Sequence, residues 1–142
     1  MIATIADVRL IELQHHASPT GELVVMQGGE AVPFQIARVF FVHAHAGAVR
    51  GMHAHKLCSQ FMLACAGRIE VTCDDGMRTE RFLLAGRRAG LLVPPGIWAE
   101  EKYMDDTAGL AVLCDRPYEV DDYIRDYAQF KAFRATLKEV GS

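Results

Sequence analysis

Short runs of apolar residues, separated by turns rich in glycine, proline and aspartate, make up most of this chain of 142 residues. Apolar and polar residues alternate in several runs, as they do in half-buried β-strands. Segment 15–21, which contains Pro19 and Gly21, is predicted to be a loop. We predict strands over 8–13, 22–26, 38–45, 50–55, 58–65, 68–73, 79–84, 91–93, 98–103 and 109–114. Evenly spaced short strands with such turns favour an all-β barrel or a double-sheet jelly roll.

The pattern changes after Pro117, where apolar residues recur at helical spacing. They are Val120, Tyr123, Ile124, Tyr127, Phe130 and Phe133. We therefore predict a C-terminal α-helix over about 118–138, and we interpret its aromatic residues as packing contacts. The chain is expected to be a single domain over 1–142, with a β core over 21–117.

Composition narrows the possible partners. The net charge of −3 gives no reason to expect nucleic acid or an anionic membrane as partner. No apolar run approaches the roughly 20 residues of a membrane-spanning helix. The start of the chain lacks a basic, apolar signal segment. The four cysteines form no C-x-x-C pair and are interpreted as reduced core thiols. A cytoplasmic protein is expected.

The most informative stretch is Arg50-Gly51-Met52-His53-Ala54-His55-Lys56. Side chains alternate between the two faces of a strand, so His53 and His55 should share one face. His43 and His45 have the same spacing. These histidines could bind a metal, transfer protons, or be ordinary polar residues of a strand.

A metal would need further ligands close after His55 and on a later strand. Ser59 or Gln60 and Ala99 stand at those places, and none is a strong ligand. Acid–base chemistry suits two imidazoles with an unperturbed pKa of about 6.5. Cations such as Arg50, Lys56 and Arg38 could then hold an anionic substrate. Metal ligands and cofactors are therefore not predicted.

The chain resembles the cupin-fold 3,4-ketoisomerases of deoxysugar biosynthesis, which act on dTDP-4-keto-6-deoxyglucose. The resemblance extends from about Gly21 to Phe133, and its most specific part joins the Arg-Gly-x-His-Ala-His-Lys run to an Asp-Tyr-Ile-Arg-x-Tyr ending. The matching segments are 38–41, 49–56, Gln60, 74–76, 90–98 and 118–127.

This resemblance implies a cupin-type jelly-roll barrel, a nucleotide-diphosphate sugar as substrate, and a homodimer with exchanged N-terminal strands. It also implies that His53 and His55 are the acid/base catalysts, and we assign His55 as the base nearer C3 and His53 as its partner. The expected substrate-binding residues are Arg50 first and Arg38 second, followed by Lys56, His43, Trp98 and Gln60. Trp98 either walls the barrel mouth or packs in the core.

The chain departs from the family at several positions. Family members commonly have Trp-His where Trp98-Ala99 stands, tyrosine where His43 stands, and glutamate where Ser59 stands. Their N-terminal Asp-x-Arg-Gly loop corresponds here to Ser18-Pro19-Thr20-Gly21. Two alternatives to an isomerase therefore stay open. One is a non-catalytic domain that binds a nucleotide sugar, and the other is a metal-dependent cupin enzyme.

Overall fold

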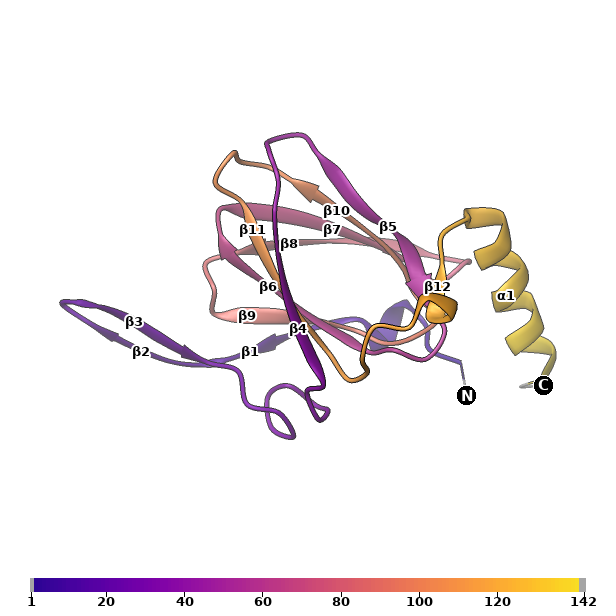
Figure 1. The fold of residues 1–142 in the computed structure, drawn as a ribbon, viewed down its shortest axis with the longest axis horizontal. Helices are drawn as coiled ribbons and strands as arrows, with labels where there is room; N and C mark the ends of the chain where they lie inside the picture. Colours follow the sequence, from indigo (N-terminus) through magenta and orange to yellow (C-terminus); the bar gives the residue numbers. More distant parts are fainter. Residues whose placement is uncertain (1, 141–142) are drawn as a thin grey trace.

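The computed structural model describes residues 2–140, with the backbone alone for residues 138–140. The outermost residues of the predicted domain, 1 and 141–142, lie outside the described range. Figure 1 shows two β-sheets, a projecting hairpin and one C-terminal helix. The elements are η1 (Ile5–Asp7), β1 (Arg9–Glu12), β2 (Gln14–Ser18), β3 (Gly21–Val25), β4 (Arg38–His43), β5 (Val49–His55), β6 (Gln60–Ala66), β7 (Arg68–Asp74), β8 (Thr79–Ala85), β9 (Ala89–Val93), β10 (Trp98–Tyr103), β11 (Gly109–Cys114), η2 (Val120–Asp122), β12 (Tyr123–Ile124) and α1 (Tyr127–Val140).

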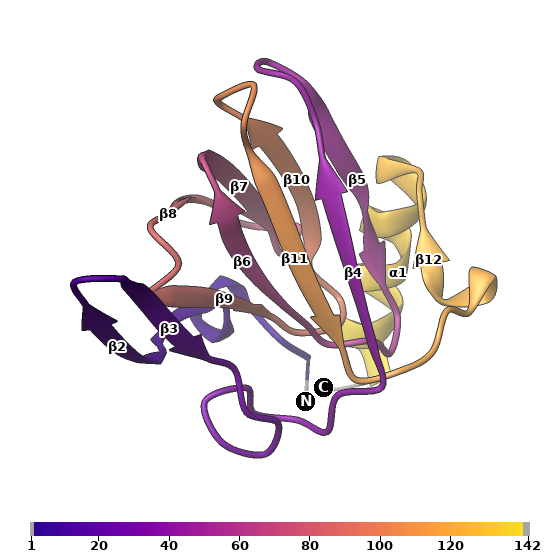
Figure 2. The same ribbon diagram turned by 60° about the vertical axis from the view of Figure 1, so that its left-hand side comes forward.

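Two five-stranded antiparallel sheets form the body of the molecule. Sheet 1 has the order β1-β9-β6-β11-β4, and sheet 2 has the order β12-β5-β10-β7-β8. From β4 to β7 successive strands alternate between the sheets, which is the connectivity of a jelly roll (Figure 2). The all-β prediction is confirmed. Among the described residues, no helix is both long and apolar enough to cross a membrane.

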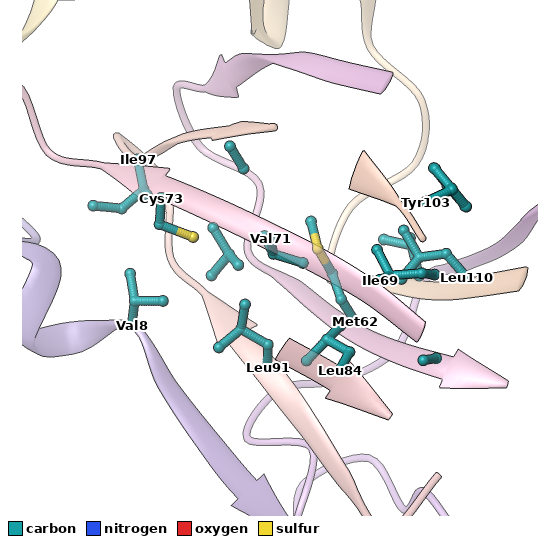
Figure 3. Packing of buried hydrophobic residues seen from close by; sticks show 14 of the residues in the cluster. Val8, Met62, Ile69, Val71, Cys73, Leu84, Leu91, Ile97, Tyr103 and Leu110 are labelled. Atoms are coloured by element: carbon teal, nitrogen blue, oxygen red, sulfur yellow. The ribbon is translucent and has the colours of Figure 1, made fainter. Parts of the chain in front are cut away.

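The main hydrophobic core lies between the two sheets (Figure 3). Met62 and Leu110 come from sheet 1, whereas Ile69, Val71 and Cys73 come from β7 of sheet 2. All five are almost completely buried. The alternation of β7 explains this packing, because every second side chain of the strand points between the sheets.

Two smaller clusters cover the outer faces. Phe61 and Leu63 of β6 pack with Val32, so segment 26–36 covers part of sheet 1. On sheet 2, Ala54 and Trp98 pack with Ile124 and Phe130. Helix α1 and the segment before it therefore lie against the outer face of β5 and β10.

The predicted C-terminal helix is correct only from Tyr127 onward. Residues 118–126 form an irregular segment with the 3₁₀ turn η2 and the short strand β12. Tertiary contacts hold it extended, because Tyr123 pairs with His55 of β5. The helix begins after Asp126, whose Oδ1 accepts a hydrogen bond from the Gln129 N–H at 2.9 Å, as a helix N-cap does.

The predicted loop over 15–21 was wrong except for the turn at Pro19 and Thr20. Residues Gln14–Ser18 form β2, which pairs with β3 in a hairpin separate from both main sheets. Every residue of β2 is exposed, so no burial alternation marked it as a strand in the sequence. The hairpin projects from the body in both views (Figures 1 and 2). All ten strands predicted elsewhere are present, with ends that differ by at most two residues.

Candidate active site

The two central histidines lie side by side on β5. Their ring centroids are 5.0 Å apart and the rings are nearly perpendicular, at 87°. Ala54, between them in the sequence, packs on the opposite face against Trp98 and Ile124. His53 and His55 therefore share the face that is turned away from helix α1, as the alternation predicted. His55 is 6% exposed, whereas His53 is only partly buried.

A β-bulge just before His53 sets its orientation. Gly51 and Met52 have positive φ angles of 82° and 56°, and the pairing of β10 with β5 shifts between Ala99 and Glu100. Ala99 thus faces His53 across the strands. The His53 Nδ1 lies 2.9 Å from the Gly51 carbonyl oxygen. Since a carbonyl only accepts, Nδ1 carries the proton and Nε2 is left as the basic nitrogen.

His55 is oriented by a carboxylate from η2, the turn that follows the last strand of sheet 1 in the chain. Its Nδ1 lies 2.9 Å from Oδ2 of Asp122, and both side chains are 6% exposed. The other oxygen of Asp122, Oδ1, accepts the Leu57 N–H at 2.7 Å. Asp122 acts as an acceptor at both oxygens, so the proton of the His55 ring belongs on Nδ1. The Nε2 of His55 is enclosed and has no hydrogen-bond partner.

Tyr123 and Arg38 complete the surroundings of the two rings. The Tyr123 ring lies 4.4 Å from His55 and 5.0 Å from His53, centroid to centroid. Arg38 donates from Nη2 to the Tyr123 hydroxyl at 3.2 Å. The Arg125 guanidinium lies over the Tyr123 ring at 4.3 Å. The segment after the barrel thus brings an aromatic ring and the Arg125 guanidinium to the histidines, and β4 contributes Arg38.

Burial keeps both histidines neutral near pH 7. It lowers the pKa of His53 to about 4, an effect that the Gly51 carbonyl opposes and that the nearby His55 and Arg125 reinforce. Burial also lowers the pKa of His55, against the opposite influence of Asp122. A neutral imidazole can accept a proton, so each ring is prepared to act as a base.

A buried carboxyl group, Glu101, lies beyond the bulge. It is 6% exposed, and its Oε2 has no hydrogen-bond partner. Burial raises its pKa to about 7, while the charge of its cross-strand partner Arg50 works in the opposite direction. A Cβ atom at Gly51 would lie only 1.8 Å from Glu101 Oε2, so the carboxyl group occupies the space that this glycine leaves.

The structure brings only some of the predicted binding residues to the histidines. Arg38 and the buried Gln60 are close to each other, because both donate to Cys114 Sγ, at 3.8 Å and 3.7 Å. Arg50 is exposed and lies beyond the bulge, opposite Glu101. The Lys56 side chain is exposed, and its backbone N–H binds the Asp122 carbonyl at 2.9 Å.

Two predicted residues lie elsewhere. His43 is exposed on the outer face of β4, and its Nε2 is 2.9 Å from the Asp106 carbonyl oxygen. Trp98 packs beneath α1, with its ring centroid 5.3 Å from that of Tyr127 and 5.7 Å from that of Phe130. Of its two open interpretations, the structure favours core packing.

Sequence reasoning missed Asp122 and Tyr123 as site residues. Both were assigned to a helix, and Tyr123 was read as part of its packing stripe. A local signal was present in the adjacent acids Asp121 and Asp122, which follow Pro117 and the last of the predicted strands. The partner of Asp122 is 67 positions away, so no local pattern could identify it.

Comparison with known proteins identifies the family. Residues 6–135 match the family model described as FdtA: WxcM-like, C-terminal. The chain belongs to this family. A TDP-4-oxo-6-deoxy-alpha-D-glucose-3,4-oxoisomerase of Aneurinibacillus thermoaerophilus is 31% identical over 130 residues, which cover 91% of this chain and 94% of that protein. The expected membership of the 3,4-ketoisomerase family is confirmed.

Solved structures of the family have the same fold. QdtA, a sugar 3,4-ketoisomerase from Thermoanaerobacterium thermosaccharolyticum in complex with TDP, is similar with a TM-score of 0.89 and 25% identity, over 94% of this chain and 98% of that one. WlaRB, a TDP-quinovose 3,4-ketoisomerase from Campylobacter jejuni, gives a TM-score of 0.85 and 29% identity over 90% and 99%. The predicted cupin-type jelly roll with a C-terminal helix is confirmed.

Proposed function

We propose that this protein converts a TDP-linked 4-keto-6-deoxyhexose into its 3-keto isomer, with His53 and His55 as the acid/base pair. The observation that carries the proposal is the pair of neutral imidazoles, 5.0 Å apart, each with its Nδ1 proton held by a fixed acceptor. Family relatives that act on TDP-linked sugars support the choice of substrate.

The reaction requires only proton transfers. The carbonyl at C4 acidifies the hydrogen on C3, so a base can remove that proton and leave an enediolate. Protonation at C4 then gives the 3-ketone, while the C3 hydroxyl loses its proton and the C4 oxygen gains one. We assign removal of the C3 proton to His55, whose ring Asp122 orients; His53 Nε2 takes the proton of the C3 hydroxyl and delivers it to C4, and His55 returns its proton to the C4 oxygen.

Access to His55 constrains how the substrate enters. Since Nε2 of His55 is enclosed, the substrate must displace a neighbouring side chain to reach it. Tyr123, whose ring centroid is 4.4 Å from that of His55, is our candidate for this movement. Arg38 would move with it, because its Nη2 holds the Tyr123 hydroxyl. We infer that Arg38 then turns to the diphosphate, with Lys56, Gln60 and Arg50 as further contacts.

The test is an incubation with TDP-4-keto-6-deoxyglucose in deuterated water, followed by NMR. A new 3-keto sugar that carries deuterium at C4 is the expected product. His55→Asn and His53→Asn should each lower the rate by about 100-fold or more while TDP binding persists. An unchanged substrate, with no exchange at C3, would contradict the proposal.

A non-catalytic sugar-nucleotide-binding domain is the second candidate. It is favoured by Ala99, which faces His53 where family members commonly have a histidine. It would give TDP-sugar binding in calorimetry but no deuterium uptake, so the same sample distinguishes the two functions.

We further propose that the protein is a homodimer formed through sheet 1 and the β2–β3 hairpin. The outward side chains of β4, the edge strand of that sheet, include Val39 and Phe41, which are 48% and 72% exposed. Leu23 on the hairpin is 60% exposed. An exposed apolar edge strand next to a projecting hairpin is a suitable surface for strand exchange with a second copy.

A further inference from the structure

Three side chains with metal-binding atoms meet at the C-terminal end of β5, next to the Nδ1 atom of His55. They are His55 at the end of the strand, Cys58 in the loop that follows, and Asp122 from η2. One nitrogen, one sulfur and one oxygen atom from them lie within 4.8 Å of one another, and all three residues are buried. Backbone contacts hold the group together, because Asp122 accepts the N–H groups of Lys56 and Leu57.

We propose that His55, Cys58 and Asp122 form a binding site for a borderline-soft divalent cation such as Zn²⁺. Imidazole, thiolate and carboxylate are the donors that Zn²⁺ takes in proteins. With ligand distances of about 2.0–2.3 Å, tetrahedral coordination separates neighbouring donors by roughly 3.3–3.7 Å. Since the His55 Nδ1 and the Asp122 Oδ2 are 2.9 Å apart, an ion needs only a small opening of this pair. Cys58 Sγ, which donates to the Ser59 carbonyl oxygen at 3.3 Å in the free protein, gives up that bond and moves toward the ion as the third ligand, and water is the fourth.

This site is different from one built on the His-x-His motif. A motif site would use His53 with His55, together with ligands at positions 59, 60 or 99, and the residues there are poor donors. Here the ion lies on the Nδ1 side of His55, and the ring of His53 takes no part. The thiol of Cys58 is the new element, and no sequence pattern connects it with Asp122.

Binding of the ion rearranges the protons of His55 and Cys58. Asp122 accepts at both oxygens, so the neutral His55 ring carries its proton on Nδ1. When the ion binds Nδ1, this proton moves to Nε2, which has no partner in the protein. The Cys58 thiol loses its proton to solvent as the sulfur–metal bond forms. One proton is therefore released for each ion bound.

Binding of the ion has a consequence for catalysis that rests on the proposed function. A His55 ring with its proton on Nε2 and the metal on Nδ1 has no free nitrogen to accept the C3 proton. Zn²⁺ should therefore inhibit the isomerase by occupying its base. The metal site itself does not depend on this, because its ligands and proton release are measured without substrate.

The experiment titrates the metal-free full-length protein with Co²⁺ and then with Zn²⁺. We expect one ion per chain, a thiolate-to-cobalt charge-transfer band that Zn²⁺ abolishes, and about one proton released in weakly buffered solution. Cys58→Ser should lose the band and weaken Zn²⁺ binding by more than about 100-fold, since it removes a direct ligand. The matched control is Cys65→Ser, which alters a partly buried cysteine outside the group.

Thermal unfolding of the Cys58→Ser protein checks that it is folded, and Asp122→Asn provides a second variant that should also weaken binding. Equal Zn²⁺ affinity in the wild type and in Cys58→Ser, or a cobalt spectrum without the thiolate band, would overturn the site. If Zn²⁺ binds as described but leaves the isomerase rate unchanged, the inhibitory role is refuted. An inactive metal-free enzyme would refute the proposed function and leave the cobalt experiment intact.

Discussion

Asp122 Oδ2 lies 2.9 Å from His55 Nδ1, although the two residues are 67 positions apart in the chain. Oδ1 of the same carboxylate binds the Leu57 N–H, so Asp122 fixes both the ring and the loop that follows it. A buried carboxylate that holds the Nδ1 proton of an imidazole sets the tautomer of the ring and leaves Nε2 as the base. Asp122 is thus a positioning residue for His55.

Asp122→Asn should therefore lower kcat by about 100-fold and leave the affinity for TDP nearly unchanged. The amide can present its NH₂ to Nδ1 and so favour the tautomer in which Nε2 carries the proton. Steady-state kinetics and calorimetry with TDP measure the two effects. Asp121→Asn changes the exposed neighbour and should keep wild-type kcat. Equal kcat in both variants would rule out the positioning role.

The bulge at Gly51 offers a test with a matched control. An alanine Cβ there would meet Glu101 Oε2 at 1.8 Å and the Ala99 carbonyl oxygen at 3.1 Å, whereas at Gly47 no atom lies within 4 Å. Both glycines have a positive φ, 82° at Gly51 and 87° at Gly47, so backbone strain is similar in the two variants. Gly51→Ala should lower the free energy of unfolding by about 2 kcal/mol more than Gly47→Ala. Chemical denaturation measures the difference, and equal losses would show that Glu101 moves away without cost.

Glu101 should make the free energy of unfolding decrease as the pH rises from 4.5 to 7. Burial raises the pKa of this carboxyl from 4.5 to about 7 in the folded protein. Between these values the unfolded chain has released the proton and the folded chain still holds it, so the folded state loses stability as the pH rises. The loss from this group is about 3 kcal/mol between pH 4.5 and pH 7, with no further change above.

Glu101→Gln should remove this contribution. The free energy of unfolding of the variant, relative to the wild type, is expected to increase by about 3 kcal/mol from pH 4.5 to pH 7. Glu70→Gln, on the outer face of the neighbouring strand β7, is the control and should follow the wild type. Parallel curves for Glu101→Gln and the wild type would mean that the carboxyl is not held protonated in the folded protein.

Phe41 tests the proposed dimer. It is 72% exposed on the outer face of β4, so Phe41→Asp should place a charge in the proposed interface and yield monomers. Light scattering coupled to size-exclusion chromatography measures the mass. Met77→Asp changes an equally exposed apolar residue, 81% exposed, at the turn between β7 and β8, and should leave the mass unaltered. A wild-type protein that is already monomeric would reject the dimer.

Much of the fold could be predicted from local pattern. Strands such as β7 and β11 are bounded by clear turns, and their apolar residues are buried as the alternation or apolar run requires. The same alternation put His53 and His55 on one face. These are local properties, because side-chain direction in a strand depends only on position along it.

The rest depended on contacts between distant segments. The stretch from Tyr118 to Asp126 has helical spacing, but pairing of Tyr123 with His55 and the bonds of Asp122 hold it extended. Gly51 and Glu101 are also coupled only across strands. His43, an expected substrate-binding residue, lies away from the two histidines for a simpler reason: its side chain is on the exposed face of β4.

The position of Asp122 and Tyr123 in the chain also sets the order in which the site comes into being. A ribosome releases β4 to β11 before it releases these two residues, so the strand that carries both histidines is made before the acceptor of His55. A nascent barrel can therefore carry both histidines while His55 still lacks its acceptor. The geometry around His55 is therefore complete only when this segment has been added, and a chain that ends before Asp122 would contain both histidines without the acceptor that orients His55.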